Sequence, residues 1–359
     1  MIVRPLTEYC TLNMGQSPDS KTYNTQGNGL PFYQGNADFG ETHPITRVWC
    51  SAPVKVAEDG DILISVRAPI GAMNMAVERC CIGRGLAALT PIRNKCSKLF
   101  LYYALQSKVD SLIAQGTGST FKAISKKVLE ATCIPAYSTI EQVQIAEIIG
   151  RVDNTIAARR NQLVLLDQLV KSRFIELFGD CDLTHPQESW VTIKEIGSVV
   201  GGATPKTDHD EYWGGSYRWI TPAELDADSG YIYDSVRKLT KAGVESCSLQ
   251  EMPVGTVILS SRAPIGKVAI AGNTFYCNQG FKNIICKEGI TPRYLYAVLL
   301  LNVEYLNSLG RGATFKEISK GIVESIRIPV PSMELQEQFA AFVEQTDKSK
   351  LCGKMEVAA

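Results

Sequence analysis

Two short segments that carry basic side chains each occur twice in this chain of 359 residues. Arg67 and Arg262 each begin an Arg-Ala-Pro-Ile-Gly segment, and Lys122 and Lys316 each follow Thr-Phe. A guanidinium can grip a phosphate or pair with the O6 and N7 edge of guanine, and an ammonium group suits phosphate. The structural alternative is a scaffold turn in which the arginine donates to backbone carbonyls. Because these residues recur at the same places, we expect a structural role or a phosphate contact for all four rather than base readout.

These segments belong to a repeat that spans the chain. Gly60–Gly71 returns as Gly255–Gly266 with seven of twelve positions identical, and Thr117–Lys127 returns as Arg311–Gly321 with seven of eleven identical. The offset stays at 194 to 195 in this part of the chain and falls to 187 further upstream, where identity almost disappears. The sequence therefore predicts a tandem duplication in which one part of each half is shared and another part differs.

The same elements are expected in each half, and they must position the basic segments. Turn-rich sequence with short strands leads to a strand at 62–66 or 257–261, which stops at the Arg-Ala-Pro-Ile-Gly turn. An apolar helix follows at 99–115 or 292–309, and an Ile-Pro strand end closes each half. The fold class is α+β, with two similar α/β domains.

A long helix is predicted between the two halves, from Ser138 to Gly179. Ser138 and Glu141 form the S-x-x-E pattern of a helix start, and glycine is the residue type that most easily follows a helix end. Such a helix would be about 60 Å long, so it reads as a spacer that needs a partner helix. An amphipathic helix packed on a domain surface is the alternative.

One stripe of this helix has the 3,4 spacing of a coiled-coil seam. The predicted helix-helix or partner interface consists of Ile149, Val152, Ile156, Arg159, Leu163, Leu166 and Val170. The second half should feed its own helix, which begins near Glu334 and is expected to be short. The predicted domains are residues 1–137, the central helix 138–180, residues 181–331, and the C-terminal helix 332–359.

Composition and charge limit the classes of function that this sequence can have. The formal net charge is zero, residues 1–137 carry 14 Lys+Arg against 10 Asp+Glu, and residues 181–331 carry 15 against 16, so any affinity for DNA must come from local patches or from a partner. No run of eighteen apolar residues and no signal peptide occur, so a cytoplasmic protein is expected. The eleven cysteines and three histidines lack metal-ligand spacing, and reduced thiols and no metal site are expected.

Catalytic motifs are not found in the sequence. There is no Walker A loop, dinucleotide-binding G-x-G-x-x-G, H-E-x-x-H, G-x-S-x-G or Asn/Asp-Pro-Pro-aromatic segment. We therefore expect a non-catalytic recognition protein.

The order and doubling of these motifs resemble the specificity (S) subunits of type I restriction-modification systems. The resemblance rests on the doubled Arg-Ala-Pro-Ile-Gly and Gly-x-Thr-Phe-Lys-x-Ile-Ser segments, the Ile-Pro…Glu-Gln…Ile-Ala segment at 134–146, and residues 166–179. It covers residues 1 to about 350. Such a subunit has two target-recognition domains, each reading one half of a split site in double-stranded DNA.

The resemblance also implies partners. Paired long helices would set the spacing of the half-sites and dock two modification (methyltransferase) subunits, and restriction or motor subunits would join through them. The cofactors S-adenosylmethionine, ATP and Mg would be bound by those partners and none by this chain. No membrane is implied.

If the halves read different sequences, the reading side chains should lie where the halves differ. Gln and Asn can pair with adenine and Arg with guanine. The candidates are Lys21, Gln34 and Asn36 in the first half and Lys206, Arg218 and Thr221 in the second. The alternative for each is an ordinary solvated loop residue.

Two rival functions remain open at this level. One is a two-domain scaffold or carbohydrate-type binding protein that uses the same loops without nucleic acid. The other is a truncated, silent copy of an S subunit.

Overall fold

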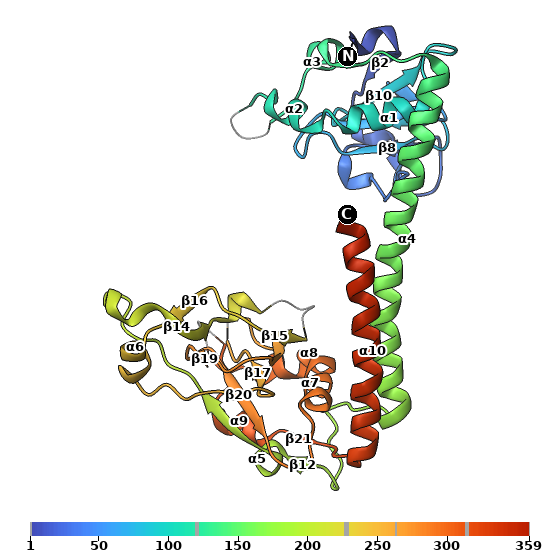
Figure 1. The fold of residues 1–359 in the computed structure, drawn as a ribbon. Coiled ribbons are helices and arrows are strands. Elements are labelled where there is room, and N and C mark those ends of the chain that lie inside the picture. The colour runs from blue at the N-terminus through green and yellow to red at the C-terminus, as the bar shows by residue number, and fades with distance from the viewer. Residues whose placement is uncertain (1, 119–121, 226–229, 263, 313–315, 359) are drawn as a thin grey trace. The chain divides into compact units, whose positions relative to one another are not determined.

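The computed structural model describes residues 2–118, 122–225, 230–262, 264–312 and 316–358. The Thr-Phe of both Thr-Phe-Lys segments and Ala263 lie outside the described residues. The chain divides into two compact units, unit 1 (Met1–Ala157) and unit 2 (Ala158–Ala359). The division falls inside one continuous helix, α4 (Thr139–Phe178), so each unit contains one half of α4 (Figure 1).

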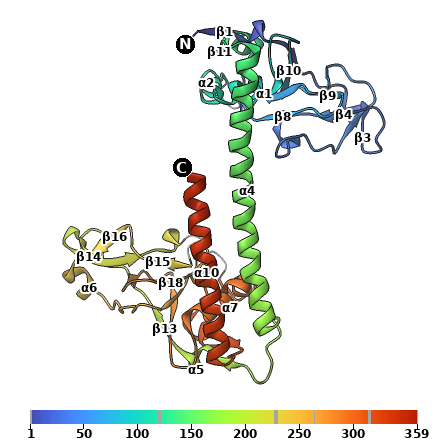
Figure 2. The ribbon, with the colours of Figure 1, turned by 45° about the vertical axis from the view of Figure 1, so that its right-hand side comes forward.

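Unit 1 consists of two sheets, a β1-β11 pair and a set of helices (Figure 2). The first sheet has the order β2-β10-β7-β8 and the second has the order β3-β5-β4-β9-β6. The elements are β1 (Val3–Pro5), β2 (Cys10–Met14), β3 (Tyr23–Asn24), β4 (Leu30–Tyr33), β5 (Trp49–Cys50), β6 (Val56–Ala57), β7 (Ile62–Ser65), β8 (Met73–Met75), β9 (Cys80–Ile82), β10 (Leu86–Pro91), α1 (Lys98–Gln106), α2 (Val109–Ala114), α3 (Lys126–Ala131) and β11 (Cys133–Pro135).

The alternation of side chains along β7 explains how one strand of the first sheet contributes to two cores. Ile62 and Ile64 face the core that contains helix α1 and Ala146 of α4. Leu63 points the other way, into a second core with Tyr33 of β4 and other residues of the second sheet. All of β7 is therefore buried, and it lies between the helix layer and the second sheet.

Unit 2 has corresponding layers. One sheet has the order β13-β20-β17-β18-β15, the other has the order β16-β14-β19, and β12 pairs with β21. The elements are β12 (Val191–Thr192), α5 (Ile193–Ile196), β13 (Gly197–Gly201), β14 (Trp213–Ile220), β15 (Tyr231–Ile232), β16 (Arg237–Leu239), α6 (Lys241–Glu245), β17 (Val257–Leu259), β18 (Val268–Ala271), β19 (Tyr276–Cys277), β20 (Lys282–Cys286), α7 (Pro292–Leu301), α8 (Val303–Ser308), α9 (Lys320–Ser325), β21 (Arg327–Ile328) and α10 (Met333–Ala358).

The strand registers confirm the duplication, including the part where sequence identity is lost. Phe32 of β4 pairs in parallel with Cys81 of β9, and Trp219 of β14 pairs in parallel with Tyr276 of β19. These pairs are related by the two offsets, 187 for the first partner and 195 for the second. We call the sheets that contain them the variable lobes (β3-β5-β4-β9-β6 in unit 1, β16-β14-β19 in unit 2) and the remainder of each unit the scaffold lobe.

The helices expected at 99–115 and 292–309 are wrong as single helices, because each is broken into two. Helix α1 gives way to α2 at Ser107, whose hydroxyl donates to the Ala104 carbonyl. Helix α7 gives way to α8 at Asn302, whose amide donates to the Val298 and Cys181 carbonyls. Side chains that bond nearby backbone compete with the helical ladder, and this competition accounts for the breaks.

The ends of α4 follow the local sequence signals. The Ser138 backbone N–H and hydroxyl donate to the Glu141 carboxylate at 2.8 and 2.7 Å, which confirms the helix start. These hydrogen bonds, the hydroxyl's first, lower the pKa of Glu141. Gly179 follows the helix with a φ of 75°, as expected for a residue in the left-handed region.

A buried glutamine fixes the start of each long helix. Gln142 accepts from the Ser97 N–H at 2.9 Å and donates to the Lys95 and Tyr137 carbonyls at 3.1 and 3.0 Å. In α10, Gln336 accepts from the Thr291 N–H at 2.7 Å and donates to the carbonyls of Gly289 and Pro331 at 3.0 and 2.9 Å. Every partner is related by the offset of 194, so the duplication extends to individual hydrogen bonds.

Within unit 2, α10 runs antiparallel to the second half of α4 (Figures 1 and 2). The Phe174 ring lies 5.5 Å from the Phe339 ring near the start of α10. Further along, Lys350 pairs with Asp167, and a Cβ on Gly353 would lie 3.4 Å from Leu163. Helix α4 has 40 residues and α10 has 26.

Among the described residues, no helix is long and apolar enough to cross a membrane.

Candidate nucleic-acid interface

The structure brings the two shared basic segments of unit 1 together. Arg67 forms a β-bridge with Ala123, next to Lys122, and the Ala68 N–H donates to the Lys122 carbonyl at 3.0 Å. The side chains of Arg67 and Lys122 are exposed. The two cations therefore lie on neighbouring backbone segments at the surface, an arrangement suited to a phosphate backbone.

Unit 2 repeats this backbone arrangement with different surroundings. Arg262 bridges Glu317, which follows Lys316. The Glu317 carboxylate lies 3.9 Å from the Arg262 guanidinium and 3.0 Å from Lys282 Nζ. In unit 1 the corresponding positions hold Ala123 and Ala87. Arg262 is thus partly neutralised by a carboxylate that unit 1 does not have at this position.

The first-half candidates for base contact lie in the variable lobe. Gln34 follows β4 and exchanges hydrogen bonds with the Ser17 hydroxyl at 2.9 and 3.1 Å. Lys21 is exposed in a 3-10 turn at 20–22, and Asn36 is half-buried at the start of another at 36–38. Gln34 is the candidate whose polar group is both exposed and oriented by a neighbour.

The second-half candidates differ in how far they are already engaged. Arg218 lies 3.2 Å from the Asp234 carboxylate, and the Thr221 hydroxyl donates to Glu224 at 3.1 Å as part of a helix cap. Lys206 is exposed, and its carbonyl accepts from the Trp213 indole. The side chains of Arg218 and Thr221 therefore already make contacts that stabilise the variable lobe.

Two exposed side chains were missed by the sequence analysis. Arg84 lies between β9 and β10, and Gln279 occupies the same position between β19 and β20. The Arg84 N–H donates to the Ser17 hydroxyl at 3.3 Å, and the Thr204 hydroxyl donates to the Gln279 side-chain oxygen at 2.6 Å. The signal was present in the sequence, because the offset of 195 that aligns Gly85 with Gly280 also aligns these two residues.

The predicted seam residues follow one stripe of α4. Ile149, Ile156, Arg159, Leu163, Leu166 and Val170 are half-buried, whereas Val152 is 53% exposed. Leu163 and Val170 are among those that pack within unit 2, and Arg159 donates to Gln162 at 2.8 Å. Other apolar side chains of α4 remain exposed, namely Ile140, Val143, Ile148, Val164, Leu165, Leu169 and Ile175.

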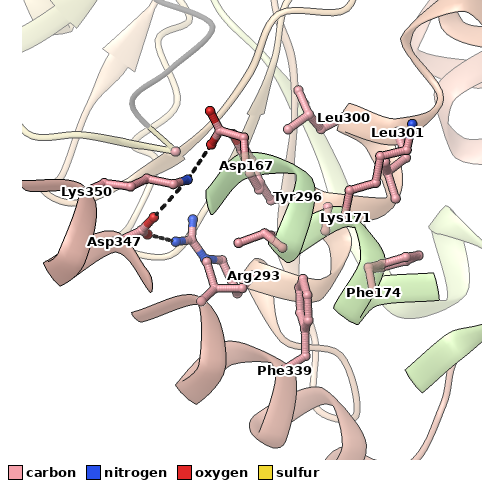
Figure 3. A pocket seen from close by; sticks show the side chains of 14 residues that line it. Asp167, Lys171, Phe174, Arg293, Tyr296, Leu300, Leu301, Phe339, Asp347 and Lys350 are labelled. Atoms are coloured by element: carbon pink, nitrogen blue, oxygen red, sulfur yellow. Dashed lines mark hydrogen bonds and ion pairs between the residues drawn. The ribbon is translucent and has the colours of Figure 1, made fainter. Parts of the chain in front are cut away.

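A cleft of about 290 Å³ lies where α4, α7 and α10 meet in unit 2 (Figure 3). Phe174 and Phe339 line its apolar part, and a chain of charges crosses it from Arg293 through Asp347 and Lys350 to Asp167. The Arg293 side chain is 10% exposed, and its guanidinium also lies over the rings of Tyr231 and Tyr296. Since these four charges pair with one another, the cleft resembles a helix junction more than a catalytic centre.

Titratable groups give no sign of a metal or redox site in the described part of the chain. No cluster of His, Cys, Asp and Glu there could hold a metal ion. The eleven cysteines are free thiols, six of them buried, and burial raises the pKa of Cys10 and of Cys277 to about 12. Such thiols behave as small apolar side chains.

Solved structures with the same fold include two from type I systems. A structure titled as the type I restriction-modification S subunit from M. genitalium aligns with a TM-score of 0.62 at 16% identity, covering 99% of this chain and 92% of that one. A second, from work on complex assembly and conformational transition of the type I R-M system, has a TM-score of 0.57 at 18% identity, covering 99% and 95%. At these identities the likeness concerns the fold.

Sequence comparison gives the family. The MjaIX specificity subunit of Methanocaldococcus jannaschii is 43% identical over 185 residues, which is 50% of this chain and 43% of that protein. The chain spans less than half of the length of the first curated relatives it matches. The family model for the type I restriction modification DNA specificity domain matches twice, at residues 1–166 and 188–353. This chain therefore belongs to the type I restriction-modification DNA specificity family and carries two copies of its domain.

Proposed function

We propose that this chain is the DNA-recognition subunit of a type I restriction-modification enzyme and has no catalytic activity of its own. Residues 1–137 and 181–331 are its two target-recognition domains, and each reads one half of a bipartite site in double-stranded DNA. The main support is a contrast within the chain. The two units share a scaffold down to single hydrogen bonds, while exposed polar side chains at equivalent positions of the variable lobes differ.

Phosphate contact is assigned to the shared basic residues. Arg67 and Lys122 in unit 1, and Arg262 and Lys316 in unit 2, project from paired segments that both units keep. Phosphates are the same at every site, so a contact to them need not change when the recognised sequence changes. A neutral chain can bind DNA in this way if partner subunits supply further cations.

The long helices have the second role in this proposal. Residues 138–180 form the spacer, and together with α10 (within 332–359) they dock two modification subunits. The exposed Val, Leu and Ile side chains repeated along α4 support a protein partner, because covering them would remove apolar surface from water. The modification subunits would bind S-adenosylmethionine, and motor subunits would bind ATP and Mg. The complex would act on DNA in the cytoplasm.

The proposal is tested by sequencing methylated bases in host DNA with and without this gene. We expect one bipartite motif to depend on the gene. Methylation that is identical in the two strains while the complex is expressed would contradict the proposal. If purified chain fails to associate with the modification subunits, the silent-copy alternative gains support.

The spacer role has its own test. Four helical residues inserted after Ala157 lengthen α4 by about 6 Å, which corresponds to roughly two base pairs. The gap between the half-sites should widen by about that amount while both half-sites stay the same. An unchanged gap in a complex that still methylates DNA would contradict the spacer role.

A further inference from the structure

The turn after β9 and the turn after β19 present one side chain each at the same place in the repeat. Arg84 is exposed between two buried glycines, Gly83 and Gly85. Gln279 is exposed between Asn278 and the buried Gly280. Arginine and glutamine are the side chains that pair in bidentate fashion with guanine and adenine, respectively.

The backbone beneath Arg84 is held on several sides. The Gly83 N–H donates to the Tyr33 carbonyl at 2.8 Å, and the Gly85 N–H donates to the Gln34 carbonyl at 3.1 Å. A Cβ on Gly83 or Gly85 would collide with Gln34, so the close approach requires glycine. Within the described residues no carboxylate pairs with the Arg84 guanidinium. A long cationic side chain is therefore presented from a fixed base.

Unit 2 holds its turn in a related manner and also orients the side chain. The Asn278 N–H donates to the Ile220 carbonyl at 3.2 Å, and the Gly280 N–H donates to the Asn278 side chain at 2.9 Å. The Thr204 hydroxyl donates to Gln279 Oε1 at 2.6 Å. This bond uses one lone pair of Oε1 and leaves the other lone pair and the Nε2 donors for adenine.

Both turns adjoin the shared basic segments. In unit 1 the Val66 N–H donates to the Gly85 carbonyl, and the Ile124 N–H donates to the Val66 carbonyl, so Val66 lies between the Arg84 turn and the Lys122 segment. In unit 2 the Ser261 N–H donates to the Gly280 carbonyl at 2.8 Å, and the Ile318 N–H donates to the Ser261 carbonyl at 3.0 Å. A position whose residue type differs between the two units thus lies close to the segments that carry the shared basic residues.

We propose that Arg84 and Gln279 are the specificity-determining residues at equivalent positions of the two units. Arg84 pairs with the O6 and N7 of a guanine in one half-site, and Gln279 pairs with the N6 and N7 of an adenine in the other. This inference rests on the proposed function, in which each unit reads one half-site. It differs from the assignment of Arg67, because the tip of the turn carries a different residue type in each unit.

The test uses the full chain in complex with its modification subunits and a library of DNA duplexes with randomised positions. Methylated duplexes are sequenced for the wild type and for Arg84→Gln, Arg84→Lys and Gln279→Ala. Arg79→Gln is the matched control, since Arg79 is an exposed arginine before β9 whereas Arg84 follows it. Arg84→Gln should reduce the preference for guanine at one position of one half-site by about 10- to 100-fold. Gln279→Ala should relax one adenine in the other half-site, and Arg79→Gln should keep the wild-type motif.

Three results would overturn the inference. The first is an unchanged motif in both Arg84→Gln and Gln279→Ala. The second is a loss of binding that is equal for all sequences and lowers the salt dependence by about one unit of slope, because that pattern identifies a phosphate contact. The third applies if Arg84→Gln methylates nothing: the duplexes that this variant still binds are then sequenced, and a wild-type preference for guanine among them would show that another residue reads it. A wild-type complex without any motif would instead refute the proposed function.

Discussion

Two side-chain contacts hold the long helix of each unit, and one of them is the same in both units while the other differs. The contact that is the same is made by the buried glutamine, Gln142 in α4 and Gln336 in α10, which bonds to three equivalent backbone groups. The other is an aspartate at equivalent positions. Asp347 pairs with the buried Arg293, whereas Asp153 bonds to Tyr103 and, after burial, is the next cause that raises the pKa of that tyrosine.

A similar contrast exists at the candidate DNA surface. The bridge between the Arg-Ala-Pro-Ile-Gly turn and the Thr-Phe-Lys segment is kept in both units, yet Glu317 partly neutralises Arg262 while Arg67 stands beside Ala123. The backbone-directed hydrogen bonds of the two glutamines are thus retained in the duplicated fold, whereas the side-chain partners of Arg262 and of Asp347 differ from those of their equivalents in unit 1. Recognition can then diverge without loss of the scaffold.

The largest expected effect comes from the shared glutamines. Gln336→Leu leaves the Thr291 N–H and two carbonyls without their partner, so the free energy of unfolding of unit 2 should fall by about 2–4 kcal/mol. Gln142→Leu should destabilise unit 1 by a similar amount. Hydrogen exchange, followed separately for the peptides of each unit, measures both effects.

Matched controls exist for this pair. Gln144 and Gln338 are exposed glutamines two residues further along the same helices and are themselves related by the offset of 194. Their replacement by Leu should change stability by less than about 0.5 kcal/mol. A large loss of stability in only one of the two units would contradict the equivalence of Gln142 and Gln336.

The aspartates should show a smaller and unequal effect. Asp347→Ala removes the partner of the buried Arg293 and should cost about 2 kcal/mol, less than for a fully buried pair because the Asp347 side chain is 43% exposed. Asp153→Ala should cost less than about 1 kcal/mol, since it leaves a neutral tyrosine instead of a charge. Urea unfolding monitored in each unit distinguishes the two.

The control for these variants is Glu344→Ala, which removes an exposed ion pair with Lys348 on α10. It should be nearly neutral. Equal losses for Asp347→Ala and Asp153→Ala would show that the exchange of partner has no energetic consequence.

Replacement of the two arginines of the repeated turn, Arg67 and Arg262, should lower DNA affinity to different extents. Arg67→Ala should lower the affinity of the assembled complex for all duplexes alike and reduce the slope of log affinity against log salt by about one. Arg262→Ala should have a weaker effect because Glu317 already offsets part of its charge. Fluorescence anisotropy over a salt series measures both slopes, and a changed sequence motif in either variant would contradict a phosphate role.

The smallest effect concerns the caps of two helices. Hydrogen bonds from Ser138 and from Thr192 lower the pKa of Glu141 and of Glu195 below the ordinary value of 4.5. A carboxyl group with a lowered folded-state pKa stabilises the fold above its unfolded-state pKa, and this contribution is lost as the pH falls through the folded-state value. Glu141→Gln and Glu195→Gln should therefore weaken the decline of thermal stability below pH 4.5. An acid transition identical to that of the wild type would contradict this.

Sequence reasoning succeeded where local rules decide the structure. The Ser138 cap, the positive φ of Gly179 and the doubled strands follow from residue types and spacing over a few positions. It failed where distant segments decide. The break at Asn302 depends in part on Cys181 and Leu183, more than one hundred residues earlier, which no local pattern contains.

The candidate site shows the same division. The shared basic residues were found because identity marks them, and the structure adds that they meet on paired segments. Arg84 and Gln279 were missed although they differ, because they lie next to a shared glycine in the similar part of the repeat, and because the residues that hold their turns, such as Ser17 and Thr204, follow the other offset. The strand register and these hydrogen bonds connect the two offsets in space.

A chain in which residues 1–137 replace residues 181–331 is the most direct test of two reading units on one duplicated scaffold. Both units then carry the same variable lobe, and sequencing of methylated DNA reveals what the complex recognises. A site with two copies of the first half-site is predicted. Methylation that still requires the original second half-site would contradict the account.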